Sequence, residues 1–207
     1  MVEPKIKRVW ERDFLTEIID GHLKNAQVIN QNFLHEEHYE ELWFEECVFQ
    51  NVSFLKISSN EITCRDVLFQ ECDFTNFDFS NCYMERVQFK NCKLVGTIFS
   101  PSVLKNVSFL NSNLQYCDFS LAKLTSVSFE KSMMLETSFN ECKFQKCEFQ
   151  ECSLEKADFF DTSLKDIDLS TCDISGIRFT LSSLKGVILA REQCVILASI
   201  FGVYIKE

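Results

Sequence analysis

The sequence predicts a solenoid, a rod of stacked coils in which one short unit repeats along most of the chain. Large apolar residues recur at every fifth position from Phe44 to Leu189, and 28 of these 30 positions hold Phe, Leu, Met or Ile. The position two residues earlier is small or β-branched almost throughout, and the other three positions are mostly polar. Because a helix repeats its faces every 3.6 residues and a strand every 2, a period of five indicates a repeat architecture.

Each unit of five supplies one large and one small inward residue and then a corner. Large residues of successive coils would stack along a continuous core, and each coil would contact only its neighbours. With 207 residues, 46% of them hydrophobic, and only 5 Gly and 2 Pro, the chain has enough core for one compact domain without flexible linkers.

Four units carry a closer resemblance to a known family. CDFTN (72–76), FDFSN (77–81), CDFSL (117–121) and ADFFD (157–161) resemble the pentapeptide-repeat family, whose unit reads small, Asp or Asn, Leu or Phe, polar, any. The resemblance implies an all-β fold, a right-handed quadrilateral β-helix with four units per coil. Thirty units then give about 7.5 coils, and a spacing of about 4.8 Å makes a rod about 36 Å long.

The repeats occupy residues 44–189, and residues 1–43 are predicted to form an N-terminal cap or an irregular lead-in. In that lead-in Ile29 and Leu34 fit the frame of five, whereas Lys24 does not. Within the repeats, residues 57–66 lose the large inward residue at Ser59 and Cys64. Either a bulge or exposed protrusion forms there, or two units pack weakly.

Residues 190–207 break the rule of five and are predicted to form a capping helix and a strand. The helix would run from Arg191 to Phe201 and end at Gly202, and the strand would cover 203–205. Apolar residues cover more than half of the helix circumference, whereas a helix that merely lies on a core needs a stripe of about 100°. The excess predicts that one side caps the coil and another meets a second copy in a C2 dimer. The residues expected at these contacts are Cys194, Leu197, Ile200 and Phe201.

The chain shows no signal for a membrane or for secretion. It has no apolar run of 18 residues, and its first residues, MVEPKIKRVWERDF, lack the apolar region of a signal peptide. We therefore expect a cytoplasmic protein.

The 11 cysteines are expected to be reduced packing residues. Nine occupy the small inward positions, Cys64 takes a large one, and only Cys194 lies outside the repeats. Buried free Cys behaves as a small hydrophobe, and the cytoplasm keeps thiols reduced. Zinc is the alternative, but Cys142, Cys147 and Cys152 would lie on three successive sides of a coil instead of converging on one point. The nine are Cys47, Cys72, Cys82, Cys92, Cys117, Cys142, Cys147, Cys152 and Cys172.

The sequence offers no catalytic constellation. Its three histidines, His22, His35 and His38, all precede the repeats. His35 and His38 could bind a metal, although HEEHYEEL is typical of a solvated segment, with a helix as one option. A phosphate-binding glycine loop and a GxSxG motif are both missing. We therefore expect no enzyme activity, no cofactor and no metal.

A second resemblance concerns the C-terminal region. LKGVILAREQCVILASIFGVYIKE is similar to the C-terminal cap of Qnr-type quinolone-resistance proteins, and the body from about residue 67, including FKNCKLVGTIFSPSVLKNVSF, looks like the chromosomal Qnr-like proteins of Gram-positive bacteria. The resemblance implies an acidic dimer shaped like duplex DNA that binds DNA gyrase and topoisomerase IV and counteracts fluoroquinolones. Plasmid-borne members carry loops that interrupt the register and contribute to protection. The unbroken frame here leaves no room for them, so protection would be weaker or absent. The matching positions are Gly186, Val187, Leu189, Gln193, Leu197, Gly202, Val203 and Ile205.

Charge gives an independent indication of the partner. The net charge of −10 disfavours nucleic acid as a direct ligand and permits a basic partner. When every fourth unit is assigned to one face, the four faces carry +3, −2, −1 and −5 over residues 42–191. An acidic side of a rod is what a competitor for Lys- and Arg-lined DNA-binding surfaces needs. The most acidic face collects Glu61, Asp78, Asp118, Glu141, Asp158 and Asp161, offset only by Arg178.

Two functions therefore compete. The first is a DNA mimic that binds a type II topoisomerase. The second is a structural or protein-interaction solenoid with another partner. The aspartates that precede inward residues also have a purely structural interpretation, because a short carboxylate can hydrogen-bond the backbone at a corner.

Overall fold

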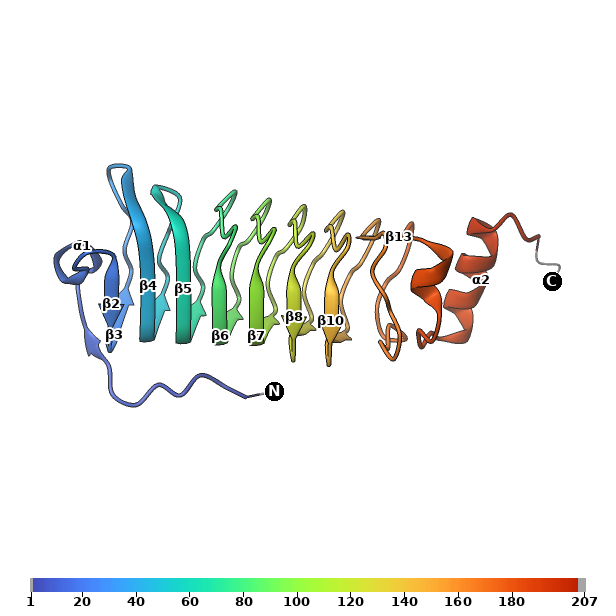
Figure 1. Cartoon of the computed structure of the whole chain (residues 1–207), viewed down its shortest axis with the longest axis horizontal. Coiled ribbons are helices and arrows are strands. Elements are labelled where there is room, and N and C mark those ends of the chain that lie inside the picture. Colours follow the sequence, from blue (N-terminus) through green and yellow to red (C-terminus); the bar gives the residue numbers. More distant parts are fainter. Residues whose placement is uncertain (1, 205–207) are drawn as a thin grey trace.

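The protein is a straight rod of stacked coils with a short helix at each end (Figure 1). The computed structural model describes residues 2–204, without the side chain of Ile200. The strands are β1 (Trp10–Glu11), β2 (His22–Lys24), β3 (Ala26–Ile29), β4 (Glu37–Gln50), β5 (Ile57–Gln70), β6 (Tyr83–Lys90), β7 (Val103–Leu110), β8 (Lys123–Thr125), β9 (Ser128–Glu130), β10 (Lys143–Gln145), β11 (Glu148–Gln150), β12 (Asp158–Phe159) and β13 (Arg178–Phe179). The helices are α1 (Phe14–Glu17), the 3₁₀ turn η1 (Leu181–Leu184) and α2 (Arg191–Ile200).

Each coil takes four units of five residues. The strands pair in parallel, and Phe69 lies opposite Phe89, which lies opposite Phe109 in the next coil. The predicted all-β solenoid with a C-terminal helix is confirmed, with about 8 turns. We number the four faces by the inward residues of one coil: face 1 contains Met84, face 2 Phe89, face 3 Leu94 and face 4 Phe99.

The period of five comes from the corners. The second residue after an inward residue usually has a positive φ, and 24 non-glycine residues adopt this left-handed conformation with φ between 47° and 63°. Left-handed backbone is costly for most L-residues but tolerable for Asn and Asp, and Asn is the most frequent residue at these corners. One such residue turns the chain, and the next unit begins on the next face.

The departure predicted at residues 57–66 comes from two corners that lack this turn. Glu41 and Glu61 occupy corner positions without a positive φ. The chain therefore continues straight, and β4 and β5 pair from Glu37 opposite Ile57 to Gln50 opposite Gln70. Both strands extend beyond the other coils in Figure 1. The segment containing His38 is accordingly a strand from Glu37 onward, and a helix there is excluded.

Stacked phenylalanines fill the core. On face 2, Phe69, Phe89 and Phe109 stack with ring centroids 5.0 Å apart. On face 4, Phe99 and Phe119 stack at 4.6 Å. Rings of the two columns meet edge to face across the coil, as aromatic quadrupoles prefer.

The N-terminal coil follows the same rule in a shifted frame. Leu23 lies opposite Phe44 and Val28 opposite Phe49, an offset of 21 residues instead of 20. The inward residues are therefore Leu23, Val28 and Phe33, which are all buried. The assignment of Ile29 and Leu34 to the inward frame is wrong by one residue, and Leu34 is 80% exposed. Because the chain has one extra residue before Phe44, counting back in steps of five from Phe44 does not reach the inward residues of this coil.

Phe14 plugs the N-terminal end of the solenoid. Its side chain is fully buried and its ring contacts Phe33 and Phe44 at 5.1 and 6.1 Å between centroids. Asp13 caps α1 by accepting a hydrogen bond from the Thr16 N–H. Residues 2–43 thus contain a cap and a strand-bearing coil.

At the C-terminal end α2 closes the rod. The helix ends at Ile200, one residue earlier than predicted, with Phe201 as its C-cap. Val203 and Tyr204 form no strand, and Ile205, where the predicted strand would end, lies outside the described residues. Within residues 2–204, no helix is long and apolar enough to cross a bilayer.

We expect the stacked rings to dominate stability. Phe119→Ala removes a fully buried ring between Phe99 and Phe139 and should lower the free energy of unfolding by about 3–5 kcal/mol. Chemical denaturation measures the loss. Leu121→Ala at the exposed corner nearby is the control and should change stability by less than about 0.5 kcal/mol. A loss below about 1 kcal/mol for Phe119→Ala would show that the register is incorrect.

Candidate functional site

Face 4 arranges its acidic residues in two columns. Asp78, Asp118 and Asp158 share one column, in which Ile98 and Ser138 alternate with them. Successive aspartates of this column are two coils apart, which corresponds to about 10 Å. The predicted alignment of these three carboxylates on one face is present in the structure.

These aspartates have a local role in the backbone. Asp78 and Asp118 each accept a hydrogen bond through Oδ1 from the N–H two residues later, at 2.8 Å, and Asp158 accepts the same bond at 3.1 Å. This geometry fixes the carboxylates at the surface. Asp158 also lies 3.4 Å from Arg178, which offsets part of its charge. Among the described residues, Asp78 and Asp118 have no ion-pair partner.

The second column lies at the corners. Glu141 and Asp161 are successive corner residues and are both exposed with positive φ. Glu61 belongs to the same column but lies near the other end of the rod, separated from Glu141 by Asn81, Pro101 and Leu121. The structure therefore gathers Asp118, Glu141, Asp158 and Asp161 in the C-terminal half, whereas Glu61 and Asp78 lie apart from them.

Face 4 also exposes apolar side chains. Phe160 is 53% exposed beside Asp158 and Asp161, and Leu181 is 72% exposed at the next corner of that column. Ile98 and Leu121 are exposed farther along the same face. Sequence reasoning missed these residues, although each occupies a position that is polar in most units. A face with both carboxylates and apolar groups suits a protein surface better than a purely ionic contact.

Helix α2 closes the last coil with a polar side chain. Gln193 is buried, and its Nε2 donates to the carbonyls of Leu169 and Cys172 at 2.8 and 2.7 Å. The bond to Cys172 satisfies a carbonyl that has no strand of a further coil to bind, whereas the Leu169 carbonyl also accepts from the Cys172 N–H at 2.9 Å. The signal in the sequence is a single Gln among the apolar residues of the helix.

The predicted dimer residues lie in different surroundings. Leu197 is partly buried against the core, and Cys194 is exposed. The ring of Phe201 lies 6.1 Å from that of Phe179 yet remains half exposed. The side chain of Ile200 lies outside the described residues. The helix thus covers the coil with Gln193 and Leu197 and leaves Cys194, Val195 and Phe201 at the surface.

Ten cysteines are buried and free, and Cys194 is exposed. Burial raises the pKa of Cys47 to about 11 and that of Cys82 to about 12, which keeps these thiols protonated. Within residues 2–204, no three His, Cys, Asp or Glu side chains converge as a metal site. His38 Nδ1 lies 3.0 Å from Ser58 Oγ across two strands.

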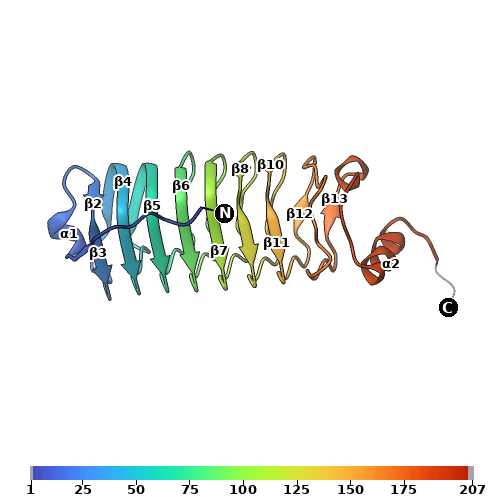
Figure 2. The same ribbon diagram turned by 90° about the horizontal axis from the view of Figure 1, so that it is seen from below.

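The N-terminal segment forms a strap across face 2. Residues 2–9 are extended and run from β7 back across β6, β5 and β4 (Figure 2). Pro4 and Ile6 are half buried, whereas Lys5, Lys7 and Arg8 are exposed. Face 2 lies opposite face 4 on the coil, so the strap leaves the acidic face open.

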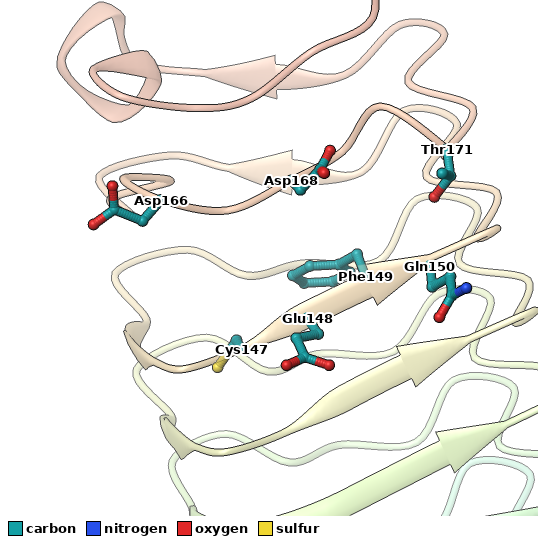
Figure 3. Close-up of a pocket in the computed structure, with 7 residues that line it drawn as sticks. All are labelled: Cys147, Glu148, Phe149, Gln150, Asp166, Asp168 and Thr171. Atoms are coloured by element: carbon teal, nitrogen blue, oxygen red, sulfur yellow. The ribbon is translucent and has the colours of Figure 1, made fainter. Parts of the chain in front are cut away.

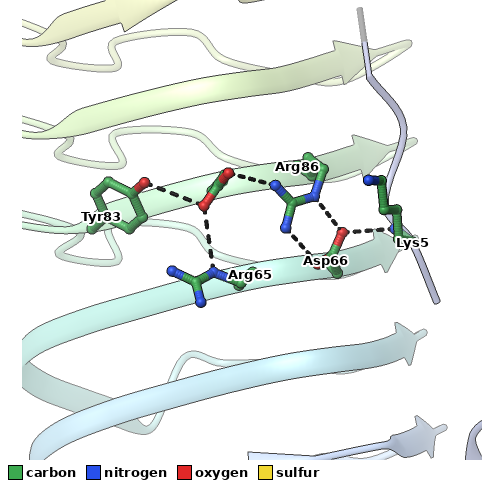
Figure 4. A network of polar contacts seen from close by, with 6 residues as sticks. Lys5, Arg65, Asp66, Tyr83 and Arg86 are labelled. Atoms are coloured by element: carbon green, nitrogen blue, oxygen red, sulfur yellow. Dashed lines mark hydrogen bonds and ion pairs between the residues drawn. The ribbon is translucent and has the colours of Figure 1, made fainter.

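One carboxylate holds the strap. Asp66 is only 6% exposed and accepts a hydrogen bond from the Lys5 backbone N–H at 2.7 Å. Arg86 donates to both Asp66 oxygens, from Nε and Nη2, at 2.7 Å each. Glu85 extends the network to Arg86, Arg65 and Tyr83 (Figure 4). The bond from Arg86, more than the bond from Lys5, lowers the pKa of Asp66 below its ordinary value.

Comparison with protein-family models gives a direct match. The model described as "Pentapeptide repeat region" matches residues 42–119 and 122–195. The chain belongs to the pentapeptide-repeat family. A search of curated proteins finds no match.

A search of solved structures finds several pentapeptide-repeat and quinolone-resistance proteins that are distantly similar to this chain. A trypsin-treated variant of QnrB1, a plasmid-mediated fluoroquinolone resistance protein, is 15% identical, with 92% of this chain and 93% of that chain covered and a TM-score of 0.45. Full-length QnrB1 is 16% identical, with 93% and 95% covered and a TM-score of 0.40. HetL, a pentapeptide-repeat protein involved in heterocyst differentiation regulation in the cyanobacterium Nostoc sp. strain PCC 7120, is 15% identical, with 88% and 92% covered and a TM-score of 0.38. Likeness at this level carries no conclusion about what this chain binds.

Asp66 gives a pH-dependent prediction. Because its folded pKa lies below the unfolded value of about 3.9, the carboxylate stabilises the fold above about pH 5, and this contribution is lost as the pH falls through the folded pKa. Asp66→Asn keeps a residue that tolerates the left-handed corner and should cost about 1–3 kcal/mol at pH 7. Denaturation at pH 7 and pH 3 should show a difference between the two chains that shrinks at low pH.

Asp161→Asn is the matched control, because Asp161 is also a left-handed corner residue, with φ 52° against 55° for Asp66, but is exposed. Its stability at pH 7 should stay within about 0.5 kcal/mol of the wild type. Equal losses for Asp66→Asn and Asp161→Asn would contradict the anchoring role of Asp66.

Proposed function

We propose that this chain is a non-enzymatic, cytoplasmic DNA mimic that binds a type II topoisomerase, DNA gyrase or topoisomerase IV, and protects it from fluoroquinolones. Its acidic face 4 would occupy the Lys- and Arg-lined surface on which the enzyme holds DNA. The observation that carries the proposal is the column of Asp78, Asp118 and Asp158, fixed at regular intervals along one side of a rigid rod. Fixed carboxylates at constant spacing offer a basic groove the kind of charge pattern that a phosphate backbone offers.

Three further features support a protein partner. Phe160 and Leu181 lie among the carboxylates of face 4. Their exposed apolar side chains would pack against apolar side chains of a protein partner. Face 4 is free of the N-terminal strap. The C-terminal segment is similar in sequence to the cap of Qnr-type proteins. Gln193, one of the matching positions, binds the carbonyls of the last coil. Kinship with the chromosomal Qnr-like proteins of Gram-positive bacteria is part of the same proposal.

We also propose that two copies associate through α2. The helix exposes Val195, Phe201 and Cys194 at the end of the rod, where a second rod could continue the acidic surface. A C2 pair would double the length of face 4 available to one enzyme.

A scaffold with another basic partner is the competing function. The exposed apolar residues of face 4 would serve such a partner equally well. Only the response of a topoisomerase to the protein distinguishes the two.

The test is a gyrase supercoiling assay with and without ciprofloxacin, combined with changes on face 4. Wild-type protein should bind gyrase and restore supercoiling in the presence of the drug. Asp118→Lys with Asp158→Lys should weaken gyrase affinity at least about tenfold, because like charges across an interface are strongly unfavourable. Wild-type affinity should also fall steeply with salt as the Debye length shortens to about 8 Å.

Asp118→Asn with Asp158→Asn is the matched control, because Asn retains a side-chain oxygen for the local backbone hydrogen bond. Circular dichroism should show both double variants folded, with the Asn pair between wild type and the Lys pair in affinity. Equal affinity for wild type and the Lys pair would reject the acidic-face mechanism. Normal gyrase behaviour with no binding would leave the scaffold function as the better account.

The dimer proposal has its own test. Phe201→Asp places a charge at the proposed contact, where an unpaired buried charge is unfavourable, and should shift the wild-type dimer to a monomer in sedimentation. Leu34→Asp, at an exposed site near the other end of the rod, should leave the dimer intact. A wild type that sediments as a monomer at tens of micromolar would exclude this association.

A further inference from the structure

The solenoid is open at one step between coils. Faces 1 and 2 of the coil that carries β10 and β11 make no main-chain hydrogen bonds to residues 163–170 of the next coil within the described chain. The same faces are joined on either side of this step. Lys131 N–H donates to the Gln150 carbonyl at 2.9 Å before it, and Leu169 N–H donates to the Ile188 carbonyl at 2.9 Å after it.

The missing bonds leave identifiable groups unpaired. In regular coils a strand N–H donates to the carbonyl 19 residues later, as Asn111 does to Glu130. By that rule Phe144, Lys146 and Phe149 should donate to residues 163, 165 and 168, but among the described residues none of these three N–H groups has a partner. Side chains substitute at the rim, where Glu151 N–H donates to Thr171 Oγ1 at 3.1 Å.

The step opens only on one side of the rod. On face 3 Leu154 N–H donates to the Asp173 carbonyl at 2.7 Å, and on face 4 Arg178 N–H donates to the Ala157 carbonyl at 2.9 Å. The two coils are therefore joined by main-chain hydrogen bonds on faces 3 and 4 and, within the described chain, lack them on faces 1 and 2.

The size of the Phe144 side chain accounts for the missing main-chain hydrogen bonds on faces 1 and 2. Face 1 carries Leu124 in the coil before and Leu164 in the coil after. The Phe144 ring contacts Phe139, Phe149 and Phe159 at 5.7, 6.0 and 6.3 Å between centroids. This aromatic cluster is larger than the core of the neighbouring coils, and Phe144 is only partly buried. Overpacking of this kind shifts backbone apart.

The opening is a real cleft with an acidic wall (Figure 3). A cavity of about 310 Å³ on the face 2 side is lined by Glu148, Asp166 and Asp168, among others. A second of about 410 Å³ on the face 1 side shares Cys147 and Asp166 with it and is also lined by Lys146 and Lys165. Among the described residues, Glu148, Asp166 and Asp168 form no ion pair. The face 2 side of the cleft thus presents three carboxylates beside unpaired main-chain groups, whereas the face 1 side also carries two lysines.

We propose that this cleft binds an extended, basic peptide segment of a partner protein by addition of a β-strand. Open strand edges recognise extended peptides through main-chain hydrogen bonds, and flanking side chains select the sequence. Lys or Arg side chains of the peptide would pair with Glu148, Asp166 and Asp168. The chain's own strap shows that a carboxylate on this face can hold an extended segment, since Asp66 accepts a hydrogen bond from the backbone N–H of Lys5. This site lies away from face 4 and does not depend on topoisomerase binding.

The test uses a fluorescein-labelled peptide of alternating Lys and Val, with fluorescence anisotropy as the measurement. The peptide should bind wild-type protein. A version N-methylated at alternate backbone amides keeps its charge and its carbonyls but cannot donate to the carbonyls of Cys142 and Cys147, which among the described residues lack the donor that the Cys82 carbonyl receives from Val103 N–H. It should bind at least about tenfold more weakly, because those hydrogen bonds to the strand edge are lost. Glu148→Gln with Asp168→Asn should weaken the unmodified peptide, and Asp78→Asn on face 4 should not.

Amide hydrogen exchange locates the site. Phe144, Lys146 and Phe149 amides should exchange rapidly in the free protein and become protected when the peptide binds. Phe144→Leu should close the cleft, protect these amides and abolish peptide binding. Equal affinity of the N-methylated and unmodified peptides, no binding to wild type, or amides already protected without peptide would each overturn the proposal. If Phe144→Leu does not fold, the comparison of the two peptides on wild-type protein still tests whether the cleft binds a peptide through main-chain hydrogen bonds.

Discussion

A residue in the left-handed conformation at the corner of most units sets the path of the chain. This residue turns the chain after each inward residue. After four such turns the chain reaches the same face again, one strand spacing farther along the axis of the rod. That return stacks Phe89 on Phe69 and Phe109 on Phe89 at 5.0 Å, and it aligns surface residues such as Asp118 and Asp158 in columns. Where the turn is missing, at Glu41 and Glu61, the strands run past the corner.

The sequence alone was sufficient for the repeat frame, the inward phenylalanines, the buried cysteines and the shared face of Asp78, Asp118 and Asp158, because each depends only on position within a strict period. The sequence did not predict the structure where an extra residue shifts the frame of five or where a contact does not follow from the repeat. The coil of Leu23, Val28 and Phe33 was missed because one extra residue displaces its frame. The strap was missed because its anchor, Asp66, is an ordinary corner residue in the sequence. The loss of main-chain hydrogen bonds beside Phe144 was missed because it depends on the combined volume of the inward side chains of one coil, and the sequence was read one position at a time.

The rod presents different chemistry on opposite sides. Face 4 combines regularly spaced carboxylates with Phe160 and Leu181, and it is free of the strap. Face 2 is covered by the strap in its N-terminal half and opens into the acidic cleft in its C-terminal half. One side therefore suits a broad basic surface, and the other suits a single extended strand. Main-chain hydrogen bonds join the two coils at the cleft on faces 3 and 4, which include the column of aspartates.

Carbodiimide cross-linking of the wild-type protein to gyrase, followed by mass spectrometry, would locate the surface that contacts the enzyme and so test whether face 4 binds where a topoisomerase holds DNA. This reagent joins carboxylates only to amines already in contact with them. We expect cross-links from Asp118, Glu141, Asp158 or Asp161 to gyrase lysines, and we expect excess DNA to abolish them. Cross-links confined to Glu148, Asp166 and Asp168, or cross-links that excess DNA leaves unchanged, would contradict binding through face 4.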